Sequence, residues 1–110
     1  QRVRRLIVNE VNKVLADYDA IVAPASGDKA PLLDDKSRDQ LSDGYLIAEN
    51  HMVIGNFTGY PSMTVPMGYV DHMPVGINIT TKAFTEVTMF DIGMAIEACT
   101  GLKDVVAEVK

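Results

Sequence analysis

The chain has 110 residues, of which 47% are hydrophobic and 23% are charged, and its formal net charge is −5. This is the composition of a folded globular chain, because disordered chains are poor in apolar residues. The acidic balance weighs against nucleic-acid binding by this segment, since phosphate contacts need clustered Lys and Arg. Its one basic cluster is Arg2, Arg4 and Arg5. We expect these three side chains to be solvated on the surface of a helix.

Several further classes are disfavoured by the same sequence. It has no run of about 18 apolar residues, so we expect no membrane span. Cys99 is the single cysteine and has no partner for an internal disulfide, which fits a reducing compartment. The first residue is Gln, and no apolar stretch follows it as in a signal peptide. We therefore expect a chain that is processed or, preferably, cut from a longer protein.

The first predicted elements are a helix at residues 3–16 and a short strand at 20–23 that Pro24 ends. The helix has an apolar stripe of period 3.6. The strand is apolar without polar alternation, which is typical of buried strands in parallel sheets. A helix followed directly by a strand indicates an α/β layered fold. The helical stripe consists of Val3, Leu6, Ile7, Val11, Val14 and Leu15.

Residues 25–42 interrupt this regular pattern. They contain Gly27 and Pro31, and their side chains are mostly polar or charged around the pair Leu32-Leu33. A loop of this length is uncommon in a compact domain. Two interpretations stay open: a mobile cover over a functional site, and a tolerated surface excursion.

A second helix is predicted at residues 44–58, with Ser42 or Asp43 as its N-cap and a stop signal at Gly59 and Pro61. Its apolar residues occupy more than one face, which is typical of a helix packed deep within a larger body. They are Leu46, Ile47, Val53, Ile54 and Phe57.

Two strands with period-two alternation follow, at residues 62–68 and 75–80. The segment 70–74 between them is short enough for a hairpin. Pro66 would remove a hydrogen-bond donor from the first strand, which predicts an edge position or a bulge there. Thr85 then caps a last helix that Gly101 ends, and residues 102–109 could form a further short helix. The apolar set of the last helix is Val87, Phe90, Met94, Ala95 and Ala98.

The residues themselves reveal no catalytic motif. There is no nucleophile elbow, no zinc-ligand spacing and no glycine-rich phosphate loop. We expect His51 to be a structural helix residue and His72 to be solvated in the hairpin turn. The six methionines are best explained as core filler. Glu49 is the exception, because a carboxylate beside the apolar helix stripe needs a partner unless it lies on the exposed face.

Two stretches resemble the C-terminal part of the amidase-signature family. They are NFTGYPSMTVPMG at 56–68 and MPVGINI at 73–79. The family pattern there is N-x-x-G-x-P-x-x-S-x-P-x-G, a short turn, and P-x-G-x-Q-x-x-G. The opening helix, followed by a Tyr-Asp strand that ends at Pro24, is also similar to the family. Thr64, Asn78 and Thr81 depart from the pattern, where Ser, Gln and Gly are usual.

The resemblance implies an α/β fragment, namely the C-terminal part of a mixed sheet flanked by helices, over residues 1–110. Family members hydrolyse amides with a Ser–Ser–Lys triad in their N-terminal half, so this segment carries no catalytic residue and should be inactive alone. The similarity is greatest to the amidotransferase subunits that release ammonia from glutamine to amidate misacylated Glu-tRNA(Gln) or Asp-tRNA(Asn). In these subunits an acidic residue binds the amino group of glutamine, and that position is Glu49 here, where Asp is usual.

The same resemblance implies a cytoplasmic carbon–nitrogen ligase with two partner subunits, B and C. It implies no cofactor in this segment, since ATP and Mg²⁺ are used by a partner subunit, and it implies that tRNA is reached through the complex. Two alternatives stay open: a fragment of a stand-alone amidase for small amides, and a non-catalytic amidase-like module for subunit contact. We expect the loop at 25–42 to lie near the pocket mouth. We also expect the isolated segment to associate, because strand edges and apolar helix faces would be exposed.

Overall fold

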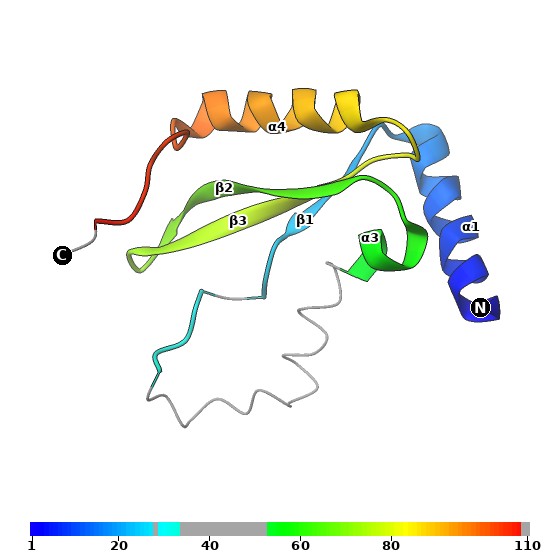
Figure 1. Ribbon diagram of the computed structural model, residues 1–110, viewed down its shortest axis with the longest axis horizontal. Coiled ribbons are helices and arrows are strands. Elements are labelled where there is room, and N and C mark those ends of the chain that lie inside the picture. Colours follow the sequence, from blue (N-terminus) through cyan, green and yellow to red (C-terminus); the bar gives the residue numbers. More distant parts are fainter. Residues whose placement is uncertain (28, 34–52, 109–110) are drawn as a thin grey trace.

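The computed structural model describes residues 1–27, 29–33 and 53–108. Along the chain these form α1 (Arg2–Asp17), β1 (Ile21–Pro24), α3 (Val53–Thr58), β2 (Ser62–Val70), β3 (Met73–Thr80) and α4 (Glu86–Thr100). Helix α4 lies along one face of the sheet, and α1 and α3 lie side by side at one end of it (Figure 1). This arrangement of a sheet flanked by helices confirms the predicted α/β class.

The sheet has three strands in the order β1-β3-β2. The hairpin of β2 and β3 turns at Asp71 and His72, whose φ angles are 49° and 65°. Positive φ at both turn residues is the geometry that matches the twist of two adjacent strands. The register shifts between Pro66 and Gly68, and β2 lies at an edge of the sheet. The predicted hairpin and the predicted disturbance at Pro66 are both confirmed.

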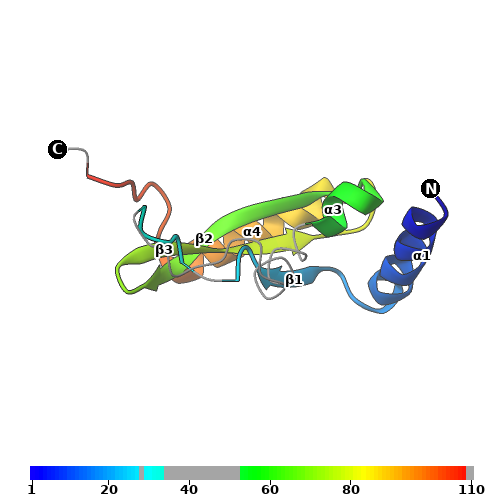
Figure 2. The same cartoon turned by 90° about the horizontal axis from the view of Figure 1, so that it is seen from below.

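The core lies between α4 and one face of this hairpin. Val65, Ile79 and Met89 are buried at its centre. Because side chains alternate along a strand, the odd-numbered residues of β2 and β3 face α4 near this point. The view from below shows α4 running along the hairpin (Figure 2). The partly buried residues around the core are Ala20, Met63, Ile77, Ile92 and Ile96.

Strand β1 differs from the prediction of a buried strand in a parallel sheet. It pairs antiparallel with β3, with Ile21 opposite Thr80 and Pro24 opposite Ile77. Within the described residues it is an edge strand, and Val22 is 50% exposed. The continuous apolar sequence of β1 predicts a buried strand, but the described residues do not bury it.

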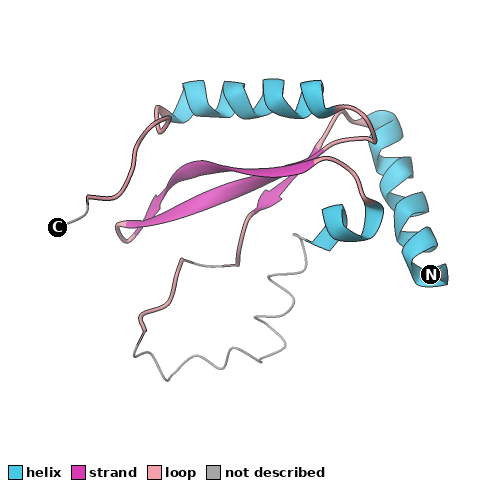
Figure 3. Cartoon of the chain, in the orientation of Figure 1, coloured by secondary structure: helices cyan, strands magenta, loops and turns pink. Residues whose placement is uncertain are grey.

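The C-terminal prediction is also corrected. Gly101 adopts φ +67° and ends α4 as predicted, with its N–H bonded to the Glu97 carbonyl at 3.0 Å. No helix follows in residues 102–108, which form a turn and a loop (Figure 3). Asp104 has φ 65°, a left-handed conformation that interrupts a right-handed helix.

The start and the apolar face of α4 also differ in detail from expectation. Thr85 occupies the N-cap position, but its hydroxyl donates to the Lys82 carbonyl at 2.6 Å and makes no cap bond. The face that packs on the sheet includes Met89 and Gly93, whereas Val87, Phe90 and Met94 are exposed. The core-filler explanation therefore holds for Met63 and Met89 but not for Met94 or Met67.

The remaining helices are described in part. Helix α1 is present as predicted, although of its apolar stripe just Leu15 is fully buried. The predicted helix at 44–58 is seen as α3 over its last six residues, and its earlier part lies outside the described residues. None of the helices in the described ranges is long and apolar enough to cross a membrane.

Candidate functional site

A cavity of about 470 Å³ lies on the face of the sheet opposite α4, beneath the connection from α3 to β2. Its walls come from α3, the α3–β2 turn, the first residues of β2 and Asn78 near the end of β3. This cavity is shallow and widely open to solvent, so a small polar molecule could reach its floor. The lining residues are Gly55, Asn56, Gly59, Tyr60, Ser62, Met63, Thr64 and Asn78.

The floor of the cavity is polar because strand alternation and register place polar residues together. Ser62 pairs with Thr80 and Thr64 pairs with Asn78 across the β2–β3 ladder. Residues two apart on a strand share a face, so all four side chains lie opposite the apolar core. Ser62, Thr64 and Asn78 line the cavity, and Thr80 is hydrogen-bonded to two of them. We refer to these four residues as the polar floor.

Asn78 holds the polar floor together. It is 5% exposed, and its amide nitrogen lies 3.2 Å from each of three acceptors: the Ser62 hydroxyl, the Thr64 hydroxyl and the Met63 carbonyl. The Thr80 hydroxyl lies 3.4 Å from both the Ser62 oxygen and the Asn78 carbonyl oxygen. Because an amide has two N–H donors, three acceptors at equal distance share them. The floor is thus a closed network.

Among the described residues, the groups at this floor are hydroxyls and an amide, which can donate and accept hydrogen bonds. The partners that the structure gives the Ser62 hydroxyl are the neutral side chains of Asn78 and Thr80. No buried side-chain nitrogen or oxygen in the described part of the chain lacks a hydrogen-bond partner. The floor can therefore orient and support a pocket, and any ligand would meet its outer hydroxyl groups.

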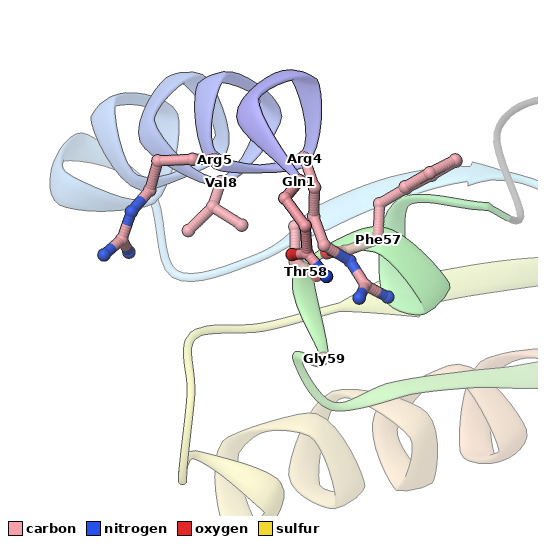
Figure 4. A pocket seen from close by; sticks show the side chains of 7 residues that line it. All are labelled: Gln1, Arg4, Arg5, Val8, Phe57, Thr58 and Gly59. Atoms are coloured by element: carbon pink, nitrogen blue, oxygen red, sulfur yellow. The ribbon is translucent and has the colours of Figure 1, made fainter.

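A second cavity, of about 480 Å³, lies between α1 and the end of α3 (Figure 4). Arg4 reaches across it, donating from Nη2 to the Asn56 carbonyl at 2.9 Å and from Nε to the Phe57 carbonyl at 3.0 Å. Arg5 lines the same cavity but points away from this contact. Arg4 is therefore not simply a solvated cation, which corrects the expectation for the basic cluster.

The residues singled out from the sequence are placed as follows. Glu49 and His51 lie outside the described residues, as does most of the loop at 25–42. His72 is exposed in the hairpin turn, as predicted, and Cys99 is an exposed free thiol. In the described ranges no group of three or more His, Cys, Asp or Glu side chains is placed to hold a metal ion.

The structure adds two features that the sequence does not reveal, the Asn78 network and the Arg4 contact. In the sequence Asn78 is a departure from a family pattern, and Arg4 is one member of a charged cluster. Nothing in the sequence links Arg4 with carbonyl groups 52 and 53 residues away. Strand register could have indicated the Asn78 network, since the hairpin is predictable, but the sequence alone does not determine that register.

Comparison with known proteins now identifies the family. A family model described as Amidase matches residues 1–90 of this chain. The chain belongs to the amidase family. Its relatives among amidases include the A subunit of glutamyl-tRNA(Gln) amidotransferase from Lactiplantibacillus plantarum, which is 41% identical over 101 residues. That match covers 90% of this chain and 20% of the relative.

Solved amidase structures agree with this assignment. The A subunit of glutamyl-tRNA(Gln) amidotransferase from Thermotoga maritima superimposes with a TM-score of 0.77 and 34% identity, covering 87% of this chain and 21% of that one. The native peptide amidase of Stenotrophomonas maltophilia gives a TM-score of 0.65 and 32% identity, covering 89% and 18%. The chain thus spans about one fifth of the length of the amidases that it matches.

Proposed function

We propose that this chain is the C-terminal part of the glutaminase subunit of a tRNA-dependent amidotransferase. The observation that carries the proposal is the 33–41% identity to several proteins named as the A subunit of glutamyl-tRNA(Gln) amidotransferase, over at least 90% of this chain. The intact protein would release ammonia from glutamine, and the complex would use it to amidate misacylated Glu-tRNA(Gln) or Asp-tRNA(Asn).

In this proposal the segment supplies scaffold and one wall of the glutamine pocket. The Ser–Ser–Lys triad would belong to the other four fifths of the protein, so activity requires the full-length chain. The B and C subunits would be the partners, ATP and Mg²⁺ would be used by one of them, and the complex would work in the cytoplasm. The neutral, hydrogen-bonded floor described above suits a supporting wall, because the partners of the Ser62 hydroxyl among the described residues are the side chains of Asn78 and Thr80.

We further propose that Glu49 binds the α-amino group of glutamine. An ammonium group beside a carboxylate is a charge-assisted hydrogen bond, worth about 1.5–3 kcal/mol. Glu49→Gln in the full-length protein should therefore raise the KM for glutamine about 10- to 100-fold. The kcat for ammonia release should change much less, because the amino group is remote from the bond that breaks. Both constants can be measured by coupled detection of ammonia.

Glu10→Gln is the matched control, since Glu10 is an exposed residue of α1 that pairs with Lys13 at 2.7 Å. It removes the same charge from a surface ion pair and should leave the KM unchanged. An unchanged KM in Glu49→Gln would show that Glu49 does not bind the substrate.

The second candidate is a stand-alone amidase, which the likeness to the peptide amidase favours. The two functions differ in their response to tRNA. A glutaminase within its amidotransferase complex should release ammonia from glutamine faster when misacylated tRNA and ATP are present. A stand-alone amidase should hydrolyse a peptide amide at a rate that is independent of both.

A further inference from the structure

At its C-terminus α3, like any helix, leaves main-chain carbonyl groups without partners inside the helix. One of these, the Gly55 carbonyl, accepts from the Gly59 N–H at 2.8 Å, which closes the helix with a left-handed glycine at φ +73°. The next two carbonyls, of Asn56 and Phe57, both accept from the Arg4 guanidinium, as described above. Helix α1 thus supplies the donors for two of the terminal carbonyl groups of α3.

A second bond ties the same turn to α1. The Tyr60 hydroxyl donates to the side-chain oxygen of Asn12, about two helical turns beyond Arg4. The Tyr60 N–H is itself bonded to the Thr58 hydroxyl at 3.2 Å. The α3–β2 turn is therefore held at two separate points along α1, before and after Gly59.

The turn that α1 holds is a wall of the cavity above the polar floor. Asn56, Gly59 and Tyr60 all line that cavity, and Gly55 lies against Ser62 in the floor itself. A displacement of the turn would therefore change the shape of the cavity. Arg4 reaches the turn from outside the cavity, because it lines the separate cavity between α1 and α3.

We propose that Arg4 is a positioning residue for the substrate pocket, acting by capping α3 and so fixing the α3–β2 turn. This rests on the proposed function in one respect, namely that the cavity belongs to the pocket wall of an amide-hydrolysing enzyme. Arg4 makes no contact with the polar floor in the described residues. Its role differs from that of its neighbour Arg5, which points away from the turn (Figure 4).

The first test compares Arg4→Gln, Arg4→Lys and the control Arg2→Gln in the full-length protein. Arg4→Gln should raise the KM for the amide substrate about three- to tenfold, with kcat within about twofold of the wild type. Arg4→Lys should restore part of the loss, because an ammonium group can bond to one carbonyl but lacks the guanidinium fork. Arg2→Gln removes the same charge from α1 and should change neither constant.

A purely structural role would give a different pattern. It would lower the fraction of active enzyme, so that kcat would fall while the KM stayed the same. That pattern, or an equal KM in Arg4→Gln and Arg2→Gln, would overturn the positioning role.

The second test needs no substrate. Hydrogen–deuterium exchange should be faster at the amides of Gly59 and Tyr60 in Arg4→Gln, and unchanged there in Arg2→Gln, because the loss of the cap loosens the turn. Unchanged exchange in Arg4→Gln would overturn the cap itself. If the wild-type protein released no ammonia from glutamine or a peptide amide, the proposed function would be wrong. The exchange experiment would still test whether Arg4 caps α3, because it does not depend on activity.

Discussion

At the scale of single residues, the polar floor depends on Asn78. This side chain is almost fully buried, and its amide serves the Ser62 and Thr64 hydroxyls and the Met63 carbonyl. A buried polar group that loses its partner costs about 1–3 kcal/mol, whereas a made hydrogen bond contributes less than that on balance. The floor is therefore sensitive to the removal of one member.

We predict that Asn78→Ala lowers the free energy of unfolding of the full-length protein by about 1–3 kcal/mol, because the Met63 carbonyl and two hydroxyls lose their common donor. Asn78→Gln keeps the amide and introduces the residue usual in the family pattern, so it should cost less than Asn78→Ala. Denaturant unfolding of the variants measures both effects.

The control for this prediction is Asn9→Ala, which removes the same amide from an exposed position of α1. It should change the free energy of unfolding by no more than about 0.5 kcal/mol. Equal effects at positions 9 and 78 would show that the network contributes nothing to stability.

The residue scale also shows the limit of prediction from sequence. Asn78 and Thr64 depart from the family pattern, and the structure shows that both keep a hydrogen-bonding role. Thr81, the third departure, is fully buried, and its N–H donates to the Pro61 carbonyl at 3.1 Å. Which groups these residues meet depends on strand register and on contacts from distant segments, neither of which is encoded locally.

At the scale of elements, α3 packs closely on β2 because residue 55 has no side chain. A Cβ at Gly55 would lie 2.9 Å from the Ser62 Cβ and 3.3 Å from its hydroxyl oxygen. The Ser62 Cβ is attached directly to the backbone, so β2 would have to move. The distance between α3 and β2 at this wall of the cavity therefore depends on Gly55.

We predict that Gly55→Ala destabilises the full-length protein, although alanine is the better helix former. Overpacking costs about 1–3 kcal/mol, and the gain in helix propensity returns at most about 1 kcal/mol. The net loss should reach about 2 kcal/mol, measured as a lower midpoint in thermal or denaturant unfolding.

Gly68→Ala provides the comparison, since a Cβ there would meet nothing within 4 Å. It should shift the free energy of unfolding by less than about 0.5 kcal/mol. If Gly55→Ala were as neutral as Gly68→Ala, the close approach of α3 to β2 would not be required.

The helices and strands are more predictable from the sequence than the way in which they pair and pack. Local periodicity predicts the β2–β3 hairpin and the helices α3 and α4 that precede and follow it in the chain. The chemistry of proline predicts the disturbance at Pro66. The antiparallel pairing of β1 and the absence of a helix in residues 102–108 do not follow from such patterns. The pairing direction of β1 is decided by β3, more than fifty residues later, and periodicity carries no information on it.

At the scale of the whole molecule, α4 is apolar on two faces, and the sheet covers just one of them. Val87, Phe90 and Met94 are 75%, 55% and 65% exposed, and their spacing places them along one side of the helix. The chain spans about one fifth of the length of its relatives. We infer that the remainder of the amidase domain covers this side of α4 in the full-length protein.

This inference predicts that Phe90→Ala destabilises the full-length protein but reduces the self-association of the isolated 110-residue chain. In the full-length protein, removing a covered phenylalanine should lower the free energy of unfolding by about 3–5 kcal/mol. In the isolated 110-residue chain the side chain is exposed, so its loss should reduce self-association, because exposed apolar patches drive aggregation. Sedimentation velocity at several concentrations measures the association, and denaturant unfolding measures the stability.

Asp91→Ala, at the next and exposed position of α4, separates this effect from general changes to the helix. It should alter neither the association of the isolated chain nor, by more than about 0.5 kcal/mol, the stability of the full-length protein. A neutral Phe90→Ala in the full-length protein would mean that this side of α4 stays in solvent there. The apolar face would then be free to contact another protein, which is the arrangement expected of a module for subunit contact.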